Sequence, residues 1–90
     1  MNLYNLKYLN TNYPRMTIRG LLVLLFLRGR GKIHFDVVAD GVGFPKSALT
    51  RVTEYLQIEG LITRERDEND RRKVILALMA DGRSLVKVML

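Results

Sequence analysis

The sequence contains no cysteine and only one histidine, His34. Without cysteine the chain has no disulfide, no thiolate metal ligand and no thiol redox chemistry. A single histidine cannot build a zinc site of the usual kind, which needs several histidine or cysteine ligands, so His34 is expected at a strand end or in a loop. Neither a metal nor a cofactor is therefore expected.

The sequence also lacks the residue combinations that run enzyme chemistry. Acid–base and nucleophilic catalysis need a nucleophile or an acid held beside a placed base. Here there is one histidine, no cysteine and no carboxylate pair with such a base. An enzyme is therefore not expected.

Acidic residues are absent from the first third of the chain. Residues 1–35 contain six lysines and arginines and no acid, whereas residues 36–90 contain nine basic and nine acidic residues. The formal net charge is +6. A basic chain favours a polyanionic partner, although charge alone also fits a ribosomal or membrane-surface protein.

No hydrophobic run is long enough to cross a membrane. The longest, residues 21–27, is seven residues, whereas a spanning helix needs about 20. It is followed by Arg28, Gly29 and Arg30 rather than by the small residues of a signal-peptide cleavage site. The run predicts a helix buried at the centre of the domain, and the protein is expected to be cytoplasmic, with no membrane partner.

Residues 1–90 are expected to form a single domain, since 90 residues suffice for one hydrophobic core. Residues 1–15 predict either a short helix or a partly ordered arm. Thr17 is the expected N-cap of the first firm helix, which runs to about residue 28. Residues 32–35 follow as a short extended segment.

Two further helices are predicted between residues 36 and 59. Asp36 is expected to cap a short helix that Gly41 and Gly43 end. Pro45 suits the first turn of a longer helix, over residues 45–59, and Gly60 stops it.

A hairpin and a last helix complete the order. Residues 61–66 and 73–78 read as strands, and residues 67–72 between them are entirely polar, which predicts a β-hairpin. Residues 80–90 carry apolar side chains at helical spacing. The predicted fold is α+β: a winged helix-turn-helix, with a three-helix core, a β-hairpin wing and a C-terminal helix.

The helix over residues 45–59 has one apolar and one polar face. Its apolar stripe follows the i, i+3, i+4, i+7 rule through Ala48, Leu49, Val52, Tyr55 and Leu56. The opposite face carries small polar and charged side chains, namely Lys46, Ser47, Thr50, Arg51 and Glu54. Hydroxyls and a guanidinium in this position suit base edges and phosphates in a DNA major groove. The alternative is an ordinary solvated helix face.

The wing is rich in cations. Arg64 and Arg66 lie on its first strand, and Arg71, Arg72 and Lys73 lead into its second. Asp70 is expected to pair with a neighbouring arginine and stiffen the tip, which leaves another arginine free to enter the minor groove. The alternative is a hairpin whose mixed charges only keep it soluble.

Residues 16–84 resemble the winged-helix core of the MarR family, the multiple-antibiotic-resistance repressors. The resemblance rests on residues 47–51, on Leu56, on residues 59–62 and above all on the wing motif at 64–72. It implies a transcription regulator that binds pseudo-palindromic double-stranded DNA as a homodimer. It also implies base contacts from the helix at 45–59 and a minor-groove arginine, here Arg71 or Arg72.

The sequence departs from the family pattern at three places. Met79 stands where a threonine usually caps the last helix, so that cap is absent or moved to Asp81. Pro45 stands where a serine often caps the recognition helix. The sequence also ends at Leu90, before the long helices through which family members dimerise. It therefore makes no prediction about a small-molecule effector, whose pocket in the family lies beside those helices.

Dimer contacts are expected from apolar residues at the two chain ends, because a two-fold protein reads two half-sites and one domain reads few base pairs. The candidates are Leu3, Leu6, Tyr13, Leu85, Val86 and Met89. The alternative function is a winged-helix protein-interaction module in a larger assembly, which the wing acids and the tyrosine-rich N-terminus would suit.

Overall fold

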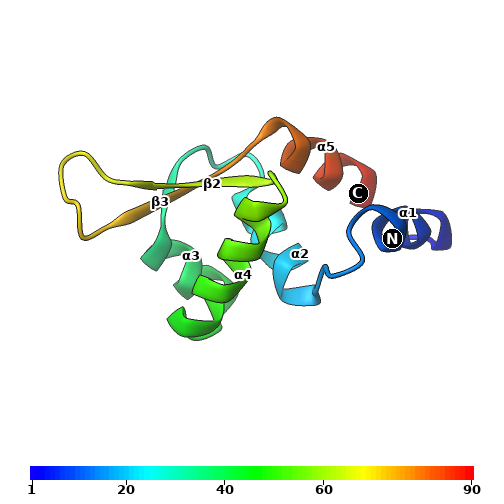
Figure 1. Cartoon of the computed structure of the whole chain (residues 1–90), viewed down its shortest axis with the longest axis horizontal. Coiled ribbons are helices and arrows are strands. Elements are labelled where there is room, and N and C mark those ends of the chain that lie inside the picture. Colours follow the sequence, from blue (N-terminus) through cyan, green and yellow to red (C-terminus); the bar gives the residue numbers. More distant parts are fainter.

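The computed structural model describes all 90 residues as five helices and a three-stranded sheet (Figure 1). In chain order the elements are α1 (Leu3–Asn12), α2 (Ile18–Leu27), β1 (Ile33–His34), α3 (Phe35–Val42), α4 (Lys46–Ile58), β2 (Ile62–Arg66), β3 (Val74–Leu78) and α5 (Ala80–Met89). The predicted winged helix is confirmed: α3 and α4 form the helix-turn-helix, and β2 and β3 form the wing.

The sheet is antiparallel, with strand order β1-β3-β2. Ile62 pairs with Leu78 at the base of the wing and Arg66 with Val74 towards its tip. The short β1 adds Ile33 opposite Leu76 and His34 opposite Ile75. The wing projects beyond the helices at one end of the molecule, and both termini lie at the other end (Figure 1).

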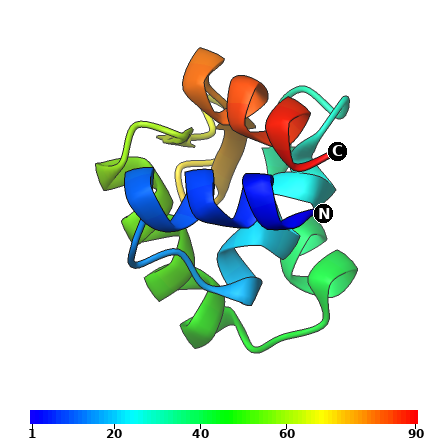
Figure 2. The ribbon, with the colours of Figure 1, turned by 90° about the vertical axis from the view of Figure 1, so that its right-hand side faces the viewer.

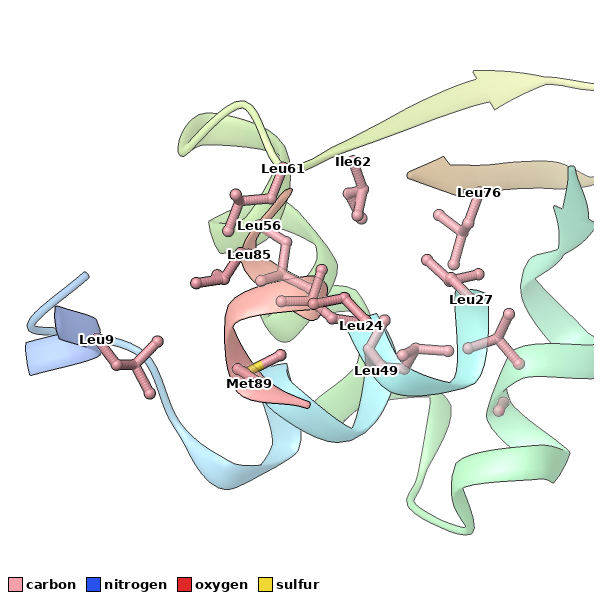
Figure 3. Packing of buried hydrophobic residues seen from close by; sticks show 14 residues of the cluster. Leu9, Leu24, Leu27, Leu49, Leu56, Leu61, Ile62, Leu76, Leu85 and Met89 are labelled. Carbon is pink, nitrogen blue, oxygen red and sulfur yellow. The ribbon is translucent and has the colours of Figure 1, made fainter. Parts of the chain in front are cut away.

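The core forms around α2, whose Val23, Leu24 and Leu27 are buried. It also takes Leu49 and Leu56 from α4, together with residues of α3, α5 and the strands (Figure 3). The prediction that the apolar run lies at the centre is confirmed for one side of α2 only. Ile18, Leu22 and Leu25 lie at i, i+4 and i+7 and are exposed, so the helix keeps an apolar stripe at the surface.

A capping side chain fixes the start of α2 but not that of α3. The Thr17 hydroxyl accepts a hydrogen bond from the backbone N–H of Gly20 at 3.1 Å, which confirms the predicted N-cap of α2. The prediction that Asp36 caps α3 is wrong. Pairing with β3 keeps His34 extended, so α3 begins at Phe35 with no capping side chain and Asp36 lies in its first turn.

Proline and glycine mark the helix-turn-helix differently from the prediction. Pro45 is the N-cap of α4, one position before the first turn. Gly41 does not end α3 but lies inside it, because α3 runs to Val42 and Gly43 follows as its C-cap. A Cβ on Gly41 would lie 2.1 Å from the Phe26 ring, so glycine there permits close packing of α3 on α2.

The N-terminal segment is a helix rather than an arm. The Asn2 side chain caps α1 by accepting from the backbone N–H of Asn5 at 2.9 Å. Leu9 is the one buried residue of α1, and α1 lies across the end of the molecule near α5 (Figure 2). Leu3 and Leu6 are exposed.

The structure corrects half of the dimer candidates. Leu85, Val86 and Met89 are 2%, 2% and 6% exposed, because α5 packs its apolar side onto the chain's own core. Side chains already buried within one chain are not offered to a second copy. Tyr13 is half-buried, which leaves Leu3 and Leu6 as the exposed candidates.

The last helix has no side-chain cap. Met79 is its N-cap residue and makes no capping hydrogen bond, and Asp81 lies in the first turn. Of the two alternatives predicted at this point, the absent cap is the one observed. An acid in the first turn still interacts favourably with the positive end of the helix.

Candidate nucleic-acid interface

The outer face of α4 presents polar and basic side chains to solvent. Lys46, Ser47 and Arg51 are exposed, and Thr50 is half-buried. Arg51 takes part in none of the chain's four ion pairs. Its planar guanidinium therefore keeps its donors for a partner molecule.

Two threonines of α4 return their hydroxyls to the helix backbone. Thr50 donates to the Lys46 carbonyl at 3.0 Å, so its hydroxyl must turn to reach any other acceptor. Thr53 is fully buried and donates to the Leu49 carbonyl at 2.8 Å. The sequence pattern assigned Thr53 to neither face of α4. Because the Leu49 carbonyl, four residues earlier, accepts its hydroxyl hydrogen bond, this polar side chain can be buried in the core.

The helix-turn-helix contains one ion pair between its two helices. Lys46 Nζ of α4 lies 3.1 Å from Asp36 Oδ1 of α3, and both side chains are 64% exposed. An exposed pair of this kind contributes little stability, about 0–1 kcal/mol. Lys46 can therefore exchange Asp36 for a phosphate at small cost.

The wing tip is organised by Asp70. Its carboxylate accepts from the backbone N–H of Arg72 at 3.1 Å and from Arg72 Nε at 3.2 Å, and the bonds to Arg72 lower the pKa of Asp70. Arg66 donates to the Arg71 carbonyl at 3.0 Å across the hairpin. The Arg71 side chain is in no ion pair and is exposed. Asp70 thus holds one arginine and leaves its neighbour available, as the sequence suggested.

The loop at the wing tip is tied to β1 by a contact that the sequence did not predict. His34 Nε2 donates to Asp67 Oδ2 at 2.8 Å, and Asp67 Oδ1 accepts from the backbone N–H of Asn69 at 2.8 Å. The His34 hydrogen bond is the main reason that the pKa of Asp67 is lowered. Only the pairing of β1 with β3 brings these residues, 33 apart in sequence, together.

Two of the hollows beside α4 border polar residues of its outer face. One, of about 360 Å³, lies between the start of α2 and α4 and is lined by Thr17, Arg19, Ser47, Ala48, Arg51 and Val52. The other, of about 160 Å³, lies between α3, α4 and the wing. Arg19 was missed at the sequence level; its guanidinium carbon lies 5.1 Å from the centre of the Phe44 ring, which places it beside the α4 face.

The remaining predicted wing residues lie in three environments. Arg64 is mostly buried, with 22% of its side chain exposed, and its Nη1 lies 4.0 Å from Glu54 Oε1 of α4. Arg66 is exposed on the outer part of β2. Lys73 is exposed where the wing returns to β3 and lines the smaller hollow together with Arg64. The predicted cations thus extend from α4 to the wing tip.

The fold and this array of cations define a winged helix-turn-helix protein with one basic face, formed by α4 and the wing. The family model described as "MarR family" matches residues 16–73, from just before α2 to the wing. The chain belongs to the MarR family. The family resemblance seen in the sequence is thereby confirmed.

Solved structures give the same result. BpsR of Bordetella bronchiseptica is 31% identical, with 86% of this chain and 58% of that chain covered and a TM-score of 0.78. PcaV of Streptomyces coelicolor is 26% identical, covering 88% and 57%, also with a TM-score of 0.78. This chain thus spans less than two thirds of the length of either protein. No curated protein sequence matches.

A third neighbour was solved with DNA. S. aureus MepR in its DNA complex matches 96% of this chain and 70% of its own, with a TM-score of 0.80 and 18% identity, which shows the shared fold.

None of the helices has the length and apolar character that a bilayer crossing requires.

Proposed function

We propose that this chain is a double-stranded DNA-binding transcription regulator of the cytoplasm, with α4 in the major groove and wing residues 67–72 in the minor groove. The observation that carries the proposal is Arg51, exposed and unpaired on a helix whose other side is fixed in the core. Family membership supports it, and so does the fold shared with MepR, which was solved as a DNA complex.

In this proposal the α4 residues divide between bases and phosphates. Arg51 reads guanine, because its fork matches the O6 and N7 acceptors. Ser47 and Thr50 reach bases or phosphates near the start of the helix. Lys46 leaves Asp36 for a phosphate, which contributes affinity without sequence preference.

The wing supplies the minor-groove contact. Arg71 enters the groove, since it is the exposed wing arginine whose side chain makes neither an ion pair nor a hydrogen bond within the chain, and narrow A·T-rich grooves attract such a cation. Arg72 stays with Asp70 and keeps the turn in shape. Arg66 supports the tip through the Arg71 carbonyl.

The regulator is proposed to act as a homodimer. Recognition helices of a two-fold dimer read half-sites about 34–36 Å apart. Leu3 and Leu6 form an exposed apolar surface on α1, at the end of the molecule opposite the wing. A second copy bound there would not cover the wing (Figure 1). Sedimentation of the chain with and without DNA tests this, and a monomer in both cases would contradict it.

Selection of bound sequences from a random duplex pool tests the function itself. A palindromic consensus is expected, and gel shifts at low and moderate salt then measure affinity. Arg51→Ala is expected to weaken binding by about 1–3 kcal/mol and to blur one base position. Arg28→Ala, a change of an exposed arginine at the far end of α2, is the matched control. Absence of duplex binding at low salt would refute the proposal.

A second candidate function is protein docking, which the exposed stripe on α2 favours. Ile18 is 76% exposed, and Leu22 and Leu25 are 43% and 40% exposed. Such a stripe is a usual mark of an interaction surface. A stable protein partner whose binding survives Arg51→Ala and Arg72→Ala but not Leu22→Asp would favour this function over DNA binding.

A further inference from the structure

The smaller hollow beside α4 has the size and lining of a site for one small anion. Its volume of about 160 Å³ is below the roughly 300–1,000 Å³ of pockets that hold drug-sized ligands. Only two of its eight lining residues are hydrophobic, and the lining comes from β1, α3, α4 and the wing. The lining residues are His34, Phe35, Asp36, Thr50, Arg64, Arg72, Lys73 and Val74.

Cations dominate this lining. Arg64, Arg72 and Lys73 face the hollow, and Asp36 is its one acid. Asp36 is already paired with Lys46 at 3.1 Å, so its charge is partly compensated. Asp67 lies outside the lining and is held by His34. The hollow therefore attracts an anion.

Arg64 carries an unmet hydrogen-bonding need. Its Nε is buried and has no partner in the chain, and its nearest acid, Glu54, is 4.0 Å from Nη1, the outer limit of an ion pair. A buried donor without an acceptor is costly, and an arginine fork suits two oxygens of a phosphate. Because Arg64 lines the hollow, a phosphate there would offer its guanidinium the acceptor oxygens that the chain does not supply.

The position of the hollow links the two DNA-reading elements. Thr50 on one side belongs to α4, and Arg72 and Lys73 on the other side belong to the wing. In the proposed complex, the DNA strand between the major groove at α4 and the minor groove at the wing passes here. The His34–Asp67 bond ties the first residue of the wing loop to β1 and so holds the two sides at a set separation.

We propose that this hollow seats one phosphate group of the DNA backbone, gripped by Arg64 and flanked by Lys73 and Arg72. The proposal rests on the proposed function. It assigns to Arg64 a role distinct from base reading: Arg64 sets the position of the strand between the two grooves.

A scan of neutral phosphates tests the seat. In a duplex obtained by the selection above, each backbone phosphate is replaced in turn by an uncharged methylphosphonate. Wild type is expected to lose about ten-fold in affinity at the seated phosphate of each half-site, in line with a charge-assisted hydrogen bond. For Arg64→Gln, neutralising the seated phosphate should cause no further loss of affinity, whereas neutralising the other phosphates should cost as much affinity as it does for wild type. Its salt dependence should fall by about one phosphate contact.

Three variants keep the result interpretable. Arg28→Gln removes the same charge in a region lined by α5 residues and should leave the scan unchanged. Arg64→Lys keeps a point charge and should retain the salt slope of wild type. If Arg64→Gln proves unfolded by circular dichroism, Lys73→Gln, an exposed change on the same hollow, should reduce the penalty at the same phosphate.

The outcomes separate the two proposals. If wild type binds no duplex, the proposed function fails. If wild type binds the duplex and Arg64→Gln loses the same affinity as wild type at every neutral phosphate, the proposed phosphate seat is refuted but the proposed function is not. Titration with inorganic phosphate against chloride of equal ionic strength, followed at Arg64 Nε by NMR, identifies the source. A phosphate-specific shift without any Arg64-dependent penalty in the duplex would mean a free phosphate ligand and would overturn the backbone seat.

Discussion

Gly41 provides a stability prediction whose sign depends on one contact. Alanine in place of glycine inside a helix normally stabilises by about 0.8–1.0 kcal/mol. Here a Cβ would lie 2.1, 2.4 and 2.8 Å from the Cε2, Cζ and Cδ2 atoms of the Phe26 ring. Phe26 must therefore move, and Arg30, whose guanidinium carbon lies 4.2 Å from the centre of that ring, must follow.

The magnitude follows from two opposing terms. Overpacking costs about 1–3 kcal/mol, and the gain in helix propensity offsets about 1 kcal/mol of it. We expect Gly41→Ala to destabilise by about 1 kcal/mol, despite its favourable propensity. In a Phe26→Ala background the ring is absent, so Gly41→Ala should instead stabilise by about 0.5–1 kcal/mol.

Urea unfolding of the four proteins in this cycle measures the effect. With a slope of about 1 kcal/mol per molar, typical of small domains, the midpoint should fall by roughly 1 M in the single variant. It should rise when the same change is made without the ring. Stabilisation by Gly41→Ala in both backgrounds would refute the close approach of α3 and Phe26.

Further outcomes follow from other contacts. Gly82→Ala should destabilise more than Gly41→Ala in the same urea assay, because its Cβ would lie 2.1 Å from the Leu61 carbonyl oxygen, and backbone yields less than a ring. Leu24→Ala should lower the unfolding free energy by about 3–5 kcal/mol, since Leu24 is fully buried; a loss below 1 kcal/mol would contradict its central place. Asp67 has a lowered pKa in the folded chain, so it stabilises above its unfolded pKa of about 3.9, and this contribution is lost as pH falls through the folded value. Asp67→Asn should therefore unfold at lower urea than wild type near pH 6, with a gap that narrows below about pH 4; a gap independent of pH would refute the role of the carboxylate. Asp70→Asn should weaken binding to the selected duplex while leaving the urea midpoint nearly unchanged, because the Asp70–Arg72 pair shapes only the exposed tip.

Periodicity was sufficient to predict the winged helix, and it failed where partners far apart in sequence decide the outcome. The stripe through Leu49 and Leu56 placed α4 correctly, and the polar run at 67–72 placed the wing. Asp36 looked like a cap because its type suits one, but pairing of β1 with β3 moved the helix start to Phe35. The contact of His34 with Asp67 depends on the same pairing.

Gly41 shows the same limit for a residue type. In a single sequence, glycine after a short apolar stretch reads as a helix end. Whether it is an end or a close-packing position depends on Phe26, which lies on another helix, 15 positions earlier. Arg19 and Arg64 follow the same reasoning, because only the fold places them beside α4.

The corrected dimer candidates show what an amphipathic pattern can decide. The helical spacing of Leu85, Val86 and Met89 predicts that one side of α5 is buried. It does not predict whether that side packs against the same chain or against a second copy. The structure answers for α5, whose apolar side completes the core. The opposite answer holds for Leu22 and Leu25, which belong to the apolar run at 21–27 predicted to be buried and yet are exposed, as is Ile18 one turn earlier. The apolar surface left for a partner is therefore on α1 and α2, and the part on α1 lies at the end of the molecule opposite the wing (Figure 1).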